Sequence, residues 1–413
     1  MKIDINGERL WESVHEYAKI GATAKGGVKR MAFSQLDYQA RDQFIDECVE
    51  LNMTITRDTI GNIFATMAGE DPELPVVMVG SHLDTQPTGG KYDGALGVLS
   101  ALEIAKSVYE AGQRPKRGLQ VVAFANEEGG RFAPAMMGSG VFSGKLALED
   151  MMAKKDIDGM TVAEELGRDS TGDYPTRPET AIDSMFEIHI EQGPILEEEG
   201  LKIGAVTGVQ AIRWYDVTII GSEAHAGPTP MTSRKDAGLG AAELSLAIER
   251  IANEHGPDGR GTVGVIVPSP ASRNVIPGSV YLTIDTRHPS DDELLSMKSK
   301  IQSVANVIAA KRGLEVDVSE IWHSPATPFD EGLIQRLEHF AAERGEPIRR
   351  IWSGAGHDAV YIAQMGVPTV MVFTQTKDGI SHNESESIKK EDAIVGCQVL
   401  ADAVVERLFT GNG

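Results

Sequence analysis

The chain of 413 residues is long enough for two domains that each bury a core, and its 41% hydrophobic and 24% charged residues are typical of a soluble globular protein. Its 61 acidic and 39 basic residues give a formal charge of −22, which argues against nucleic acid or an anionic membrane as partner. The same charge would repel a carboxylate substrate, so a site for such a substrate needs a local cation. Only two cysteines are present, Cys48 and Cys397, so we expect no disulfide framework. The N-terminus lacks the apolar core of a signal peptide and no apolar run reaches membrane-spanning length, so we expect a cytoplasmic protein.

The spacing of apolar residues predicts helices over 6–20 and 37–52 and short strands over 53–57 and 62–67. The following stretch, PVVMVGSHLDTQPTGGKYDGALG, indicates a buried strand that leads into a glycine-rich loop carrying His82, Asp84 and Asp93. An apolar helix over 96–108 and a second buried strand over 118–125 come next. This strand, helix, strand order predicts a mostly parallel sheet.

Further strands of this sheet also end in side chains that can bind metal. Glu127 and Glu128 directly follow the second strand, and His189 ends a third strand over 185–190. His382 follows a later strand, over 367–373. Because parallel strands present their carboxyl ends at one edge of a sheet, we expect these residues to share one site.

The pattern changes near residue 210. Strands are predicted over 211–225, 262–267, 280–286 and 314–321, and helices over 234–255 and 291–310. From residue 330 the earlier pattern returns, with helices over 331–344 and 392–408. We therefore predict a catalytic domain of residues 1–209 and 326–413, with helices on both faces of a mixed, mostly parallel sheet. A smaller α+β domain of residues 210–325, a four-stranded antiparallel sheet with two helices, interrupts it.

The candidate metal ligands are five nitrogen or oxygen donors, namely His82, Asp93, Glu128, His189 and His382. An odd number of ligands suits two divalent ions that share one bridging carboxylate and take two further ligands each. Two such ions can lower the pKa of a shared water and clamp a hydrolytic transition state. Glu127 is then free to act as general base, and Asp84 is placed to accept the other ring N–H of the nearby histidine.

Other interpretations exist for each residue alone. His82 and Asp93 also suit a turn, Glu127 and Glu128 the solvated start of a helix, and His189 a buried core histidine. Their joint occurrence at four strand ends favours the metal site. No G-x-S-x-G motif occurs and neither cysteine has a base nearby in sequence, which argues against a serine or cysteine nucleophile.

Several motifs resemble one family, the N-carbamoyl-L-amino-acid hydrolases, whose branch of the dinuclear aminoacylase-like metallopeptidases also contains β-ureidopropionases and allantoate amidohydrolases. The motifs are GSHLDTQPTGGKYDGALGVL, NEEGGRF, HIEQGPILE, GSEAHAGPTPM, NVIPG, DTRH, SGAGHDAVY and KDGISHNE. The resemblance implies two Zn²⁺, Mn²⁺, Co²⁺ or Ni²⁺ ions per chain. One would be held by His82, Asp93 and His189, and the other by Asp93, Glu128 and His382.

The resemblance also implies the substrate and the residues that contact it. The reaction would be hydrolysis of the carbamoyl bond of N-carbamoyl-L-amino acids, including N-carbamoyl-β-alanine. Arg287 would clamp the substrate carboxylate, His225 would assist the oxyanion across a dimer interface, and Gln192, Asn274, Gly356 and His357 would line the pocket. The smaller domain would be a lid through which a homodimer forms, and the peptide bond between Asp93 and Gly94 would be cis.

Three alternatives remain open from the sequence. The nearest is an allantoate amidohydrolase with the same metals and carboxylate clamp. A dipeptidase or aminoacylase of the same fold is the second, because the same water can attack an amide. The third is a binding or scaffolding protein without catalysis, against which the intact Glu127 and the five ligands argue.

Overall fold

The computed structural model describes residues 2–168, 177 and 180–410, and the chain divides into two compact units. Unit 1 comprises Met1–Val209 and Pro328–Gly413, and unit 2 comprises Gln210–Thr327. Among the described residues, no helix combines the length and the apolar character needed to cross a bilayer.

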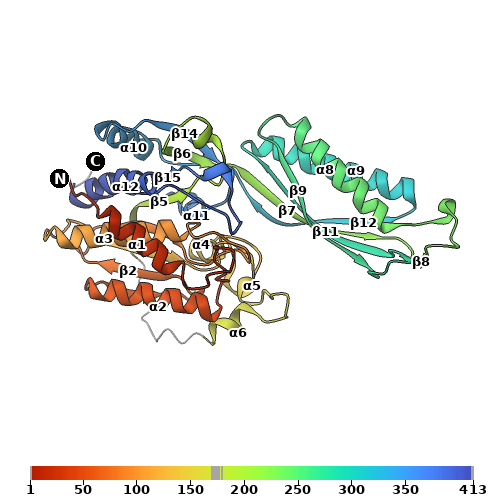
Figure 1. The fold of residues 1–413 in the computed structure, drawn as a ribbon, viewed down its shortest axis with the longest axis horizontal. Helices are drawn as coiled ribbons and strands as arrows, with labels where there is room; N and C mark the ends of the chain where they lie inside the picture. The colour runs from red at the N-terminus through yellow and green to blue at the C-terminus, as the bar shows by residue number, and fades with distance from the viewer. Residues whose placement is uncertain (1, 169–176, 178–179, 411–413) are drawn as a thin grey trace. The chain divides into compact units, whose positions relative to one another are not determined.

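Unit 1 is built on a nine-stranded mixed sheet (Figure 1). Its strands run in the spatial order β1 (Thr54–Arg57), β2 (Ile63–Met67), β4 (Leu119–Phe124), β3 (Val76–His82), β5 (Ile182–Ile190), β15 (Thr369–Thr374), β6 (Ile203–Val209) and β13 (Thr327–Pro328), with β14 (Ile348–Ser353) also paired to β6. The central strands β4, β3, β5 and β15 are mutually parallel. The carboxyl ends of these four strands therefore lie along one edge.

Helices cover both faces of this sheet. On one face, Phe64, Met78 and Met185 pack with Ile362 of α11 (Asp358–Gln364). On the other face, α3 (Ala95–Glu110) and α12 (Lys390–Phe409) pack closely against the sheet. A Cβ added to Gly97 of α3 would stand 2.7 Å from the carbonyl oxygen of Ile188 in β5, and one added to Gly396 of α12 would stand 2.9 Å from the Ile188 side chain. The remaining helices of unit 1 are α1 (Gly7–Tyr17), α2 (Gln35–Glu50), α4 (Met137–Phe142), α5 (Leu148–Met152), α6 (Val162–Leu166), α7 (Ile195–Glu198), α10 (Glu331–Glu343) and the 3₁₀ helix η2 (Lys377–Gly379).

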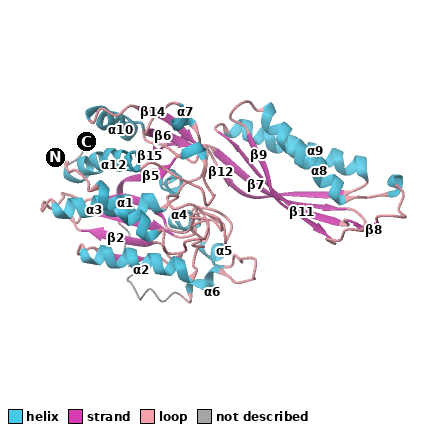
Figure 2. Ribbon diagram, viewed as in Figure 1, coloured by secondary structure: helices cyan, strands magenta, loops and turns pink. Residues whose placement is uncertain are grey.

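Unit 2 is an antiparallel sheet with two long helices on one face (Figure 2). The four strands have the order β12 (Glu315–Ser324), β7 (Ala211–Ile220), β11 (Ser279–His288) and β9 (Arg260–Ser269), and the helices are α8 (Ala237–Glu254) and α9 (Asp291–Arg312). A small second sheet pairs β8 (Ala224–His225) with β10 (Val275–Ile276), and the 3₁₀ helix η1 covers Met231–Ser233. Along β11 the buried positions alternate with more exposed ones, as expected for a sheet with one covered face.

The structure confirms the predicted fold class, a mixed and mostly parallel α/β sheet interrupted by an α+β unit. Several elements were not predicted, among them β6, β14 and α11 as well as the short helices α4 to α7. The strand β6, IGAVTGV, is rich in small residues, and β14 carries two consecutive arginines, so neither shows the apolar alternation by which strands are recognised. The boundary after unit 2 lies between Thr327 and Pro328.

Candidate metal centre

Five predicted ligands come together at the carboxyl-end edge of the central strands. They are His82 at the end of β3, Asp93 just before α3, Glu128 in the loop after β4, His189 near the end of β5, and His382 after η2. All except His382, which is about half exposed, are buried.

Asp93 is shared by two groups of possible ligands. Its Oδ1 lies 3.6 Å from Nε2 of His82 and 3.1 Å from Nε2 of His189. Its Oδ2 lies 3.5 Å from Nε2 of His382, which in turn lies 3.2 Å from Oε2 of Glu128. Each oxygen of one carboxylate thus faces a different cluster, which is the arrangement of a bridging ligand.

These spacings fit metal coordination. Ligand atoms at the corners of a tetrahedron about 2.1 Å from an ion lie roughly 3.4 Å apart. In both buried histidines the other ring nitrogen is held by a backbone carbonyl: Nδ1 of His82 lies 3.0 Å from the oxygen of Asp84, and Nδ1 of His189 lies 2.9 Å from that of Ile190. The bond fixes the tautomer in which Nε2 has a lone pair for a metal. The donor set and its spacing therefore fit divalent ions.

Asp84 acts on a different partner from the one expected. Its carboxylate is 3.8 Å from Nδ1 of His82, beyond hydrogen-bond distance, because the backbone carbonyl of the same residue already occupies that nitrogen. Instead, the two carboxylate oxygens accept from the backbone N–H groups of Glu127 at 3.1 Å and Glu128 at 3.2 Å. The prediction of a ring contact was wrong, and Asp84 holds the loop that carries the candidate base.

Glu127 lies beside the first cluster. Its Oε2 is 3.4 Å from Nε2 of His82, and the residue is only 7% exposed. Burial, together with the negative charges of Asp358 and Glu128, raises the pKa of Glu127 well above its ordinary value. A carboxylate whose pKa is raised toward neutrality is suited to accept and return a proton.

Gly94 has the unusual backbone that was expected, but its peptide bond is not cis. The cis bonds of the described residues are Ala133–Pro134 and Ser269–Pro270, so Asp93–Gly94 is trans and that prediction was wrong. Gly94 instead has φ +64°, and a Cβ there would stand 2.3 Å from the ring of His82. The close approach of backbone and ring, together with the positive φ, requires glycine at this position.

The pocket residues predicted in unit 1 lie around the same centre. Gln192 has φ +58°, and its Nε2 donates to Oδ2 of Asp93 at 2.8 Å, while its buried Oε1 has no partner among the described residues. His357 is buried, its ring centroid is 4.5 Å from that of His189, and its Nε2 lies 2.9 Å from Oγ of Ser353. Gly356 precedes it in a half-buried loop.

A third group of possible ligands, Glu187, His189 and His357, overlaps this centre. Glu187 accepts from Oγ of Ser81 at 2.7 Å and from the backbone N–H of Ala359 at 3.2 Å. His189 already faces Asp93 through Nε2. The group therefore shares His189 with the first cluster and is not separate from the candidate centre.

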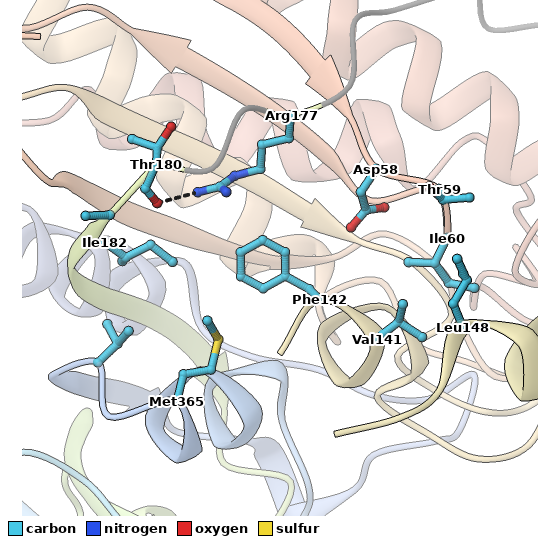
Figure 3. A pocket seen from close by; sticks show the side chains of 12 residues that line it. Asp58, Thr59, Ile60, Val141, Phe142, Leu148, Arg177, Thr180, Ile182 and Met365 are labelled. Carbon is cyan, nitrogen blue, oxygen red and sulfur yellow. Dashed lines mark hydrogen bonds between the residues drawn. The ribbon is translucent and has the colours of Figure 1, made fainter. Parts of the chain in front are cut away.

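A separate cavity of about 600 Å³ is lined by residues that follow β1, by the start of β5 and by the segment before β15 (Figure 3). Its two charged residues are engaged by protein groups. Asp58 accepts from the backbone and side chain of Asn62 at 2.8 and 2.6 Å, and Arg177 donates to Oε1 of Gln120 at 3.2 Å. None of the described residues that line this cavity is one of the five ligands.

A model of peptidase family M20/M25/M40 matches residues 78–406. The chain belongs to this family. The matched range begins within β3 and ends within α12, so it includes all five ligands and the interrupting unit.

Relatives within the M20/M25/M40 family confirm the resemblance to its carbamoylase branch. An N-carbamoyl-L-amino-acid amidohydrolase of Rhizobium meliloti is 41% identical over 97% of this chain and 96% of that protein. A ureidoglycolate hydrolase of Arabidopsis thaliana is 33% identical over 97% of this chain and 86% of that protein. The crystal structure of an amidase of the hydantoinase/carbamoylase family from Burkholderia vietnamiensis superposes with a TM-score of 0.95 at 45% identity and covers 98% of both chains.

The remaining predicted site residues of this M20/M25/M40 chain belong to unit 2. His225 is exposed on β8, and its Nδ1 accepts from the N–H of Gly227 at 3.1 Å. Asn274 is its neighbour, because the N–H of Ala226 donates to the carbonyl of Asn274 at 2.9 Å. Arg287 lies near the far end of β11, where its guanidinium binds the carboxylate of Asp285 at 2.6 to 3.2 Å.

Three residues that contact the ligands were not predicted. Gln86 donates through Nε2 to Oε2 of Glu128 at 2.9 Å, and Ser381 donates through Oγ to Oδ2 of Asp93 at 2.9 Å. Glu386 accepts from the backbone of Asp93 at 3.2 Å. The only sequence signal for Gln86 and Ser381 was their position inside the motifs that contain the candidate ligands, and Glu386 lies two residues after the last of these motifs.

Proposed function

We propose that the protein is a metal-dependent amidohydrolase that cleaves the carbamoyl C–N bond of N-carbamoyl-L-amino acids. Water adds across this bond to give the amino acid and carbamic acid, which decomposes to CO2 and NH3. The observation that carries the proposal is the carboxylate of Asp93, whose two oxygens face two separate clusters of ligands. The Rhizobium amidohydrolase, 41% identical over nearly the whole chain, supports the choice of substrate.

The proposed centre takes two divalent ions. His82, Asp93 and His189 would hold one ion, and Asp93, Glu128 and His382 the other, and such donors suit Zn²⁺, Mn²⁺, Co²⁺ or Ni²⁺. When bound, the ions supply an acidified water and polarise the carbamoyl oxygen.

Glu127 moves the proton in this reaction. Oε2 of Glu127 accepts a proton from the attacking water and returns it to the nitrogen of the leaving amino acid, so the carboxylate ends the cycle ionised. Its raised pKa favours the uptake of the proton that the second transfer returns. Oε1 of Gln192, buried without a partner among the described residues, accepts from the terminal N–H2 of the carbamoyl group.

In this proposal, the rest of the substrate would bind to residues of unit 2. The guanidinium of Arg287 is a bidentate donor suited to the substrate carboxylate, and it would exchange Asp285 for the ligand. Asn274 and His225 would bind the carbamoyl oxygen as it gains negative charge.

The geometry of unit 2 supports a homodimer with shared sites. Ser279 and Arg287 lie near opposite ends of β11, eight residues apart, which is roughly 27 Å at the usual rise of an antiparallel strand. His225 and Asn274 lie beyond the Ser279 end, because β10 precedes it directly. One small substrate does not reach both ends, so if all three residues contact it, His225 and Asn274 come from a second copy.

A second candidate is hydrolysis of ureidoglycolate or allantoate, which the 33% identical Arabidopsis relative favours. A dipeptidase or aminoacylase activity is the more distant candidate. Rates on N-carbamoyl-L-methionine, N-carbamoyl-β-alanine, allantoate, ureidoglycolate and a dipeptide, measured with metal-reconstituted protein, discriminate among them. We expect the highest kcat/KM on N-carbamoyl-L-methionine. A higher kcat/KM on ureidoglycolate or allantoate would show that the second candidate is the activity of this protein.

A further inference from the structure

Glu386 joins two loops that carry metal ligands. It lies four residues after His382 and is 5% exposed. Its Oε1 accepts from the backbone N–H of Tyr92 at 3.0 Å and of Asp93 at 3.2 Å. The loop that carries one ligand therefore supplies the acceptor that holds the backbone of another ligand.

The glycine-rich loop is shaped around this carboxylate. A Cβ on Gly90 would stand 2.0 Å from Oε1 of Glu386, so no side chain fits there while the carboxylate is in place. On the other side of the same loop, the N–H of Val28 donates to the carbonyl of Gly89 at 2.9 Å. The segment before Asp93 is thus fixed from two directions.

His382 depends on this connection for its orientation. Its side chain is about half exposed and its backbone has φ +53°, so neither burial nor regular structure fixes the ring. The residue before it, Ser381, donates to Oδ2 of Asp93 at 2.9 Å and lies 3.2 Å from Oε2 of Glu386. His382 is therefore held between two residues that both bind Asp93.

We propose that Glu386 is a positioning residue that keeps the loops of Asp93 and His382 in register, so that Asp93, Glu128 and His382 bind their ion. The inference rests on the proposed two-ion centre. Glu386 does not face the substrate, since both of its oxygens are engaged by the loops, and it acts only through Asp93 and His382.

Titration of metal-free protein with Mn²⁺ by calorimetry tests this role without measuring activity. We expect wild type to bind two ions and Glu386→Ala to bind one of them about 10- to 100-fold more weakly. Glu386→Gln should restore the affinity, because its amide oxygen accepts from the same two N–H groups. Glu384→Ala is the matched control: this glutamate lies two residues away and pairs with Lys25 at 3.5 Å, and its loss should leave both affinities unchanged.

The outcomes are separable. Fewer than two ions on wild type would overturn the proposed centre itself. Two ions on wild type and unchanged affinities in Glu386→Ala would overturn only the role of Glu386. If circular dichroism shows that the alanine variant does not fold, Glu386→Asp, which keeps the charge but shortens its reach, should still weaken one ion, and unchanged binding in that variant also overturns the inference.

Discussion

The carboxylate of Asp84 holds the backbone N–H of Glu127 at 3.1 Å, and through its second oxygen it holds Glu128 at 3.2 Å. One side chain thus sets the position of the candidate base and of a ligand together. Because both bonds run to backbone donors, the loop after β4 is fixed whatever the rotamers of the two glutamates.

We expect Asp84→Asn to lower kcat about 10- to 100-fold, because an amide retains only one acceptor oxygen for two N–H groups and the loop of Glu127 shifts. Steady-state kinetics with metal analysis measures this. Asp402→Asn is the control, since Asp402 in α12 also accepts from two nitrogens, both of Arg344 at 2.8 Å, and neither residue is a candidate ligand or adjoins one in sequence. Equal kcat in wild type and Asp84→Asn would show that the clamp has no catalytic consequence.

Glu127→Gln should retain its metal and lose turnover by about 10²- to 10⁴-fold, because the amide cannot carry the proton from water to the leaving amine. Metal content by elemental analysis and kcat on N-carbamoyl-L-methionine give the two readouts. Substantial residual turnover in this variant would remove Glu127 as the base.

Gly94→Ala should prevent normal metal binding, since its Cβ would lie 2.3 Å from the His82 ring. Gly112→Ala is a close control because Gly112 has a similar φ of +66° but no atom within 4 Å of the added Cβ. Gly112→Ala should lower the free energy of unfolding by only about 1–2 kcal/mol, which is the cost of placing a residue with a Cβ in a left-handed backbone conformation. Thermal unfolding and Mn²⁺ titration compare the two, and equal effects in both variants would refute the steric explanation.

Metal binding should release protons and strengthen as pH rises. Burial lowers the pKa of His189, but the hydrogen bond and charge of Asp93 outweigh it and raise the pKa to about 9; contacts with Glu128 likewise raise that of His382 to about 9. Protonation of these imidazoles therefore stabilises the metal-free fold fully below pH 6.5, and this contribution is lost as pH rises through about 9. At a pH below about 9, a metal ion must therefore displace the protons of these two imidazoles in order to bind. Calorimetry at pH 7.5 in buffers of different ionisation enthalpy should show release, and identical heats would contradict it.

A mixture of Glu127→Gln and His225→Ala chains tests the shared site. Each variant alone should be nearly inactive, but a mixed dimer contains one site with both native residues. Equal amounts, unfolded and refolded together, should recover about one quarter of wild-type activity if His225 serves the partner subunit's site. Mixing each variant with itself is the control. No recovery in a verified mixed dimer would place His225 in its own chain's site, whereas wild-type activity of His225→Ala alone would place it outside the reaction.

The sequence by itself determined the fold class and singled out the five candidate ligands. Buried parallel strands are continuous apolar runs, and the runs of β3 and β5 carry His82 and His189 at or next to their last residue, so these candidates are visible without coordinates. The unpredicted β6 and β14 lack that signal because small residues and arginines interrupt their patterns.

Only the tertiary structure decided how these residues are held. The contact of Asp84 with Glu127 spans 43 residues and that of Glu386 with Asp93 spans 293, and no periodicity encodes such distances. The packing also decided that Asp84 meets the His82 ring through its carbonyl oxygen, at 3.0 Å, and not through its carboxylate, at 3.8 Å. The chemistry of the centre follows from residue type and strand order, whereas its hydrogen-bonded support arises from loops that meet only when the sheet has formed.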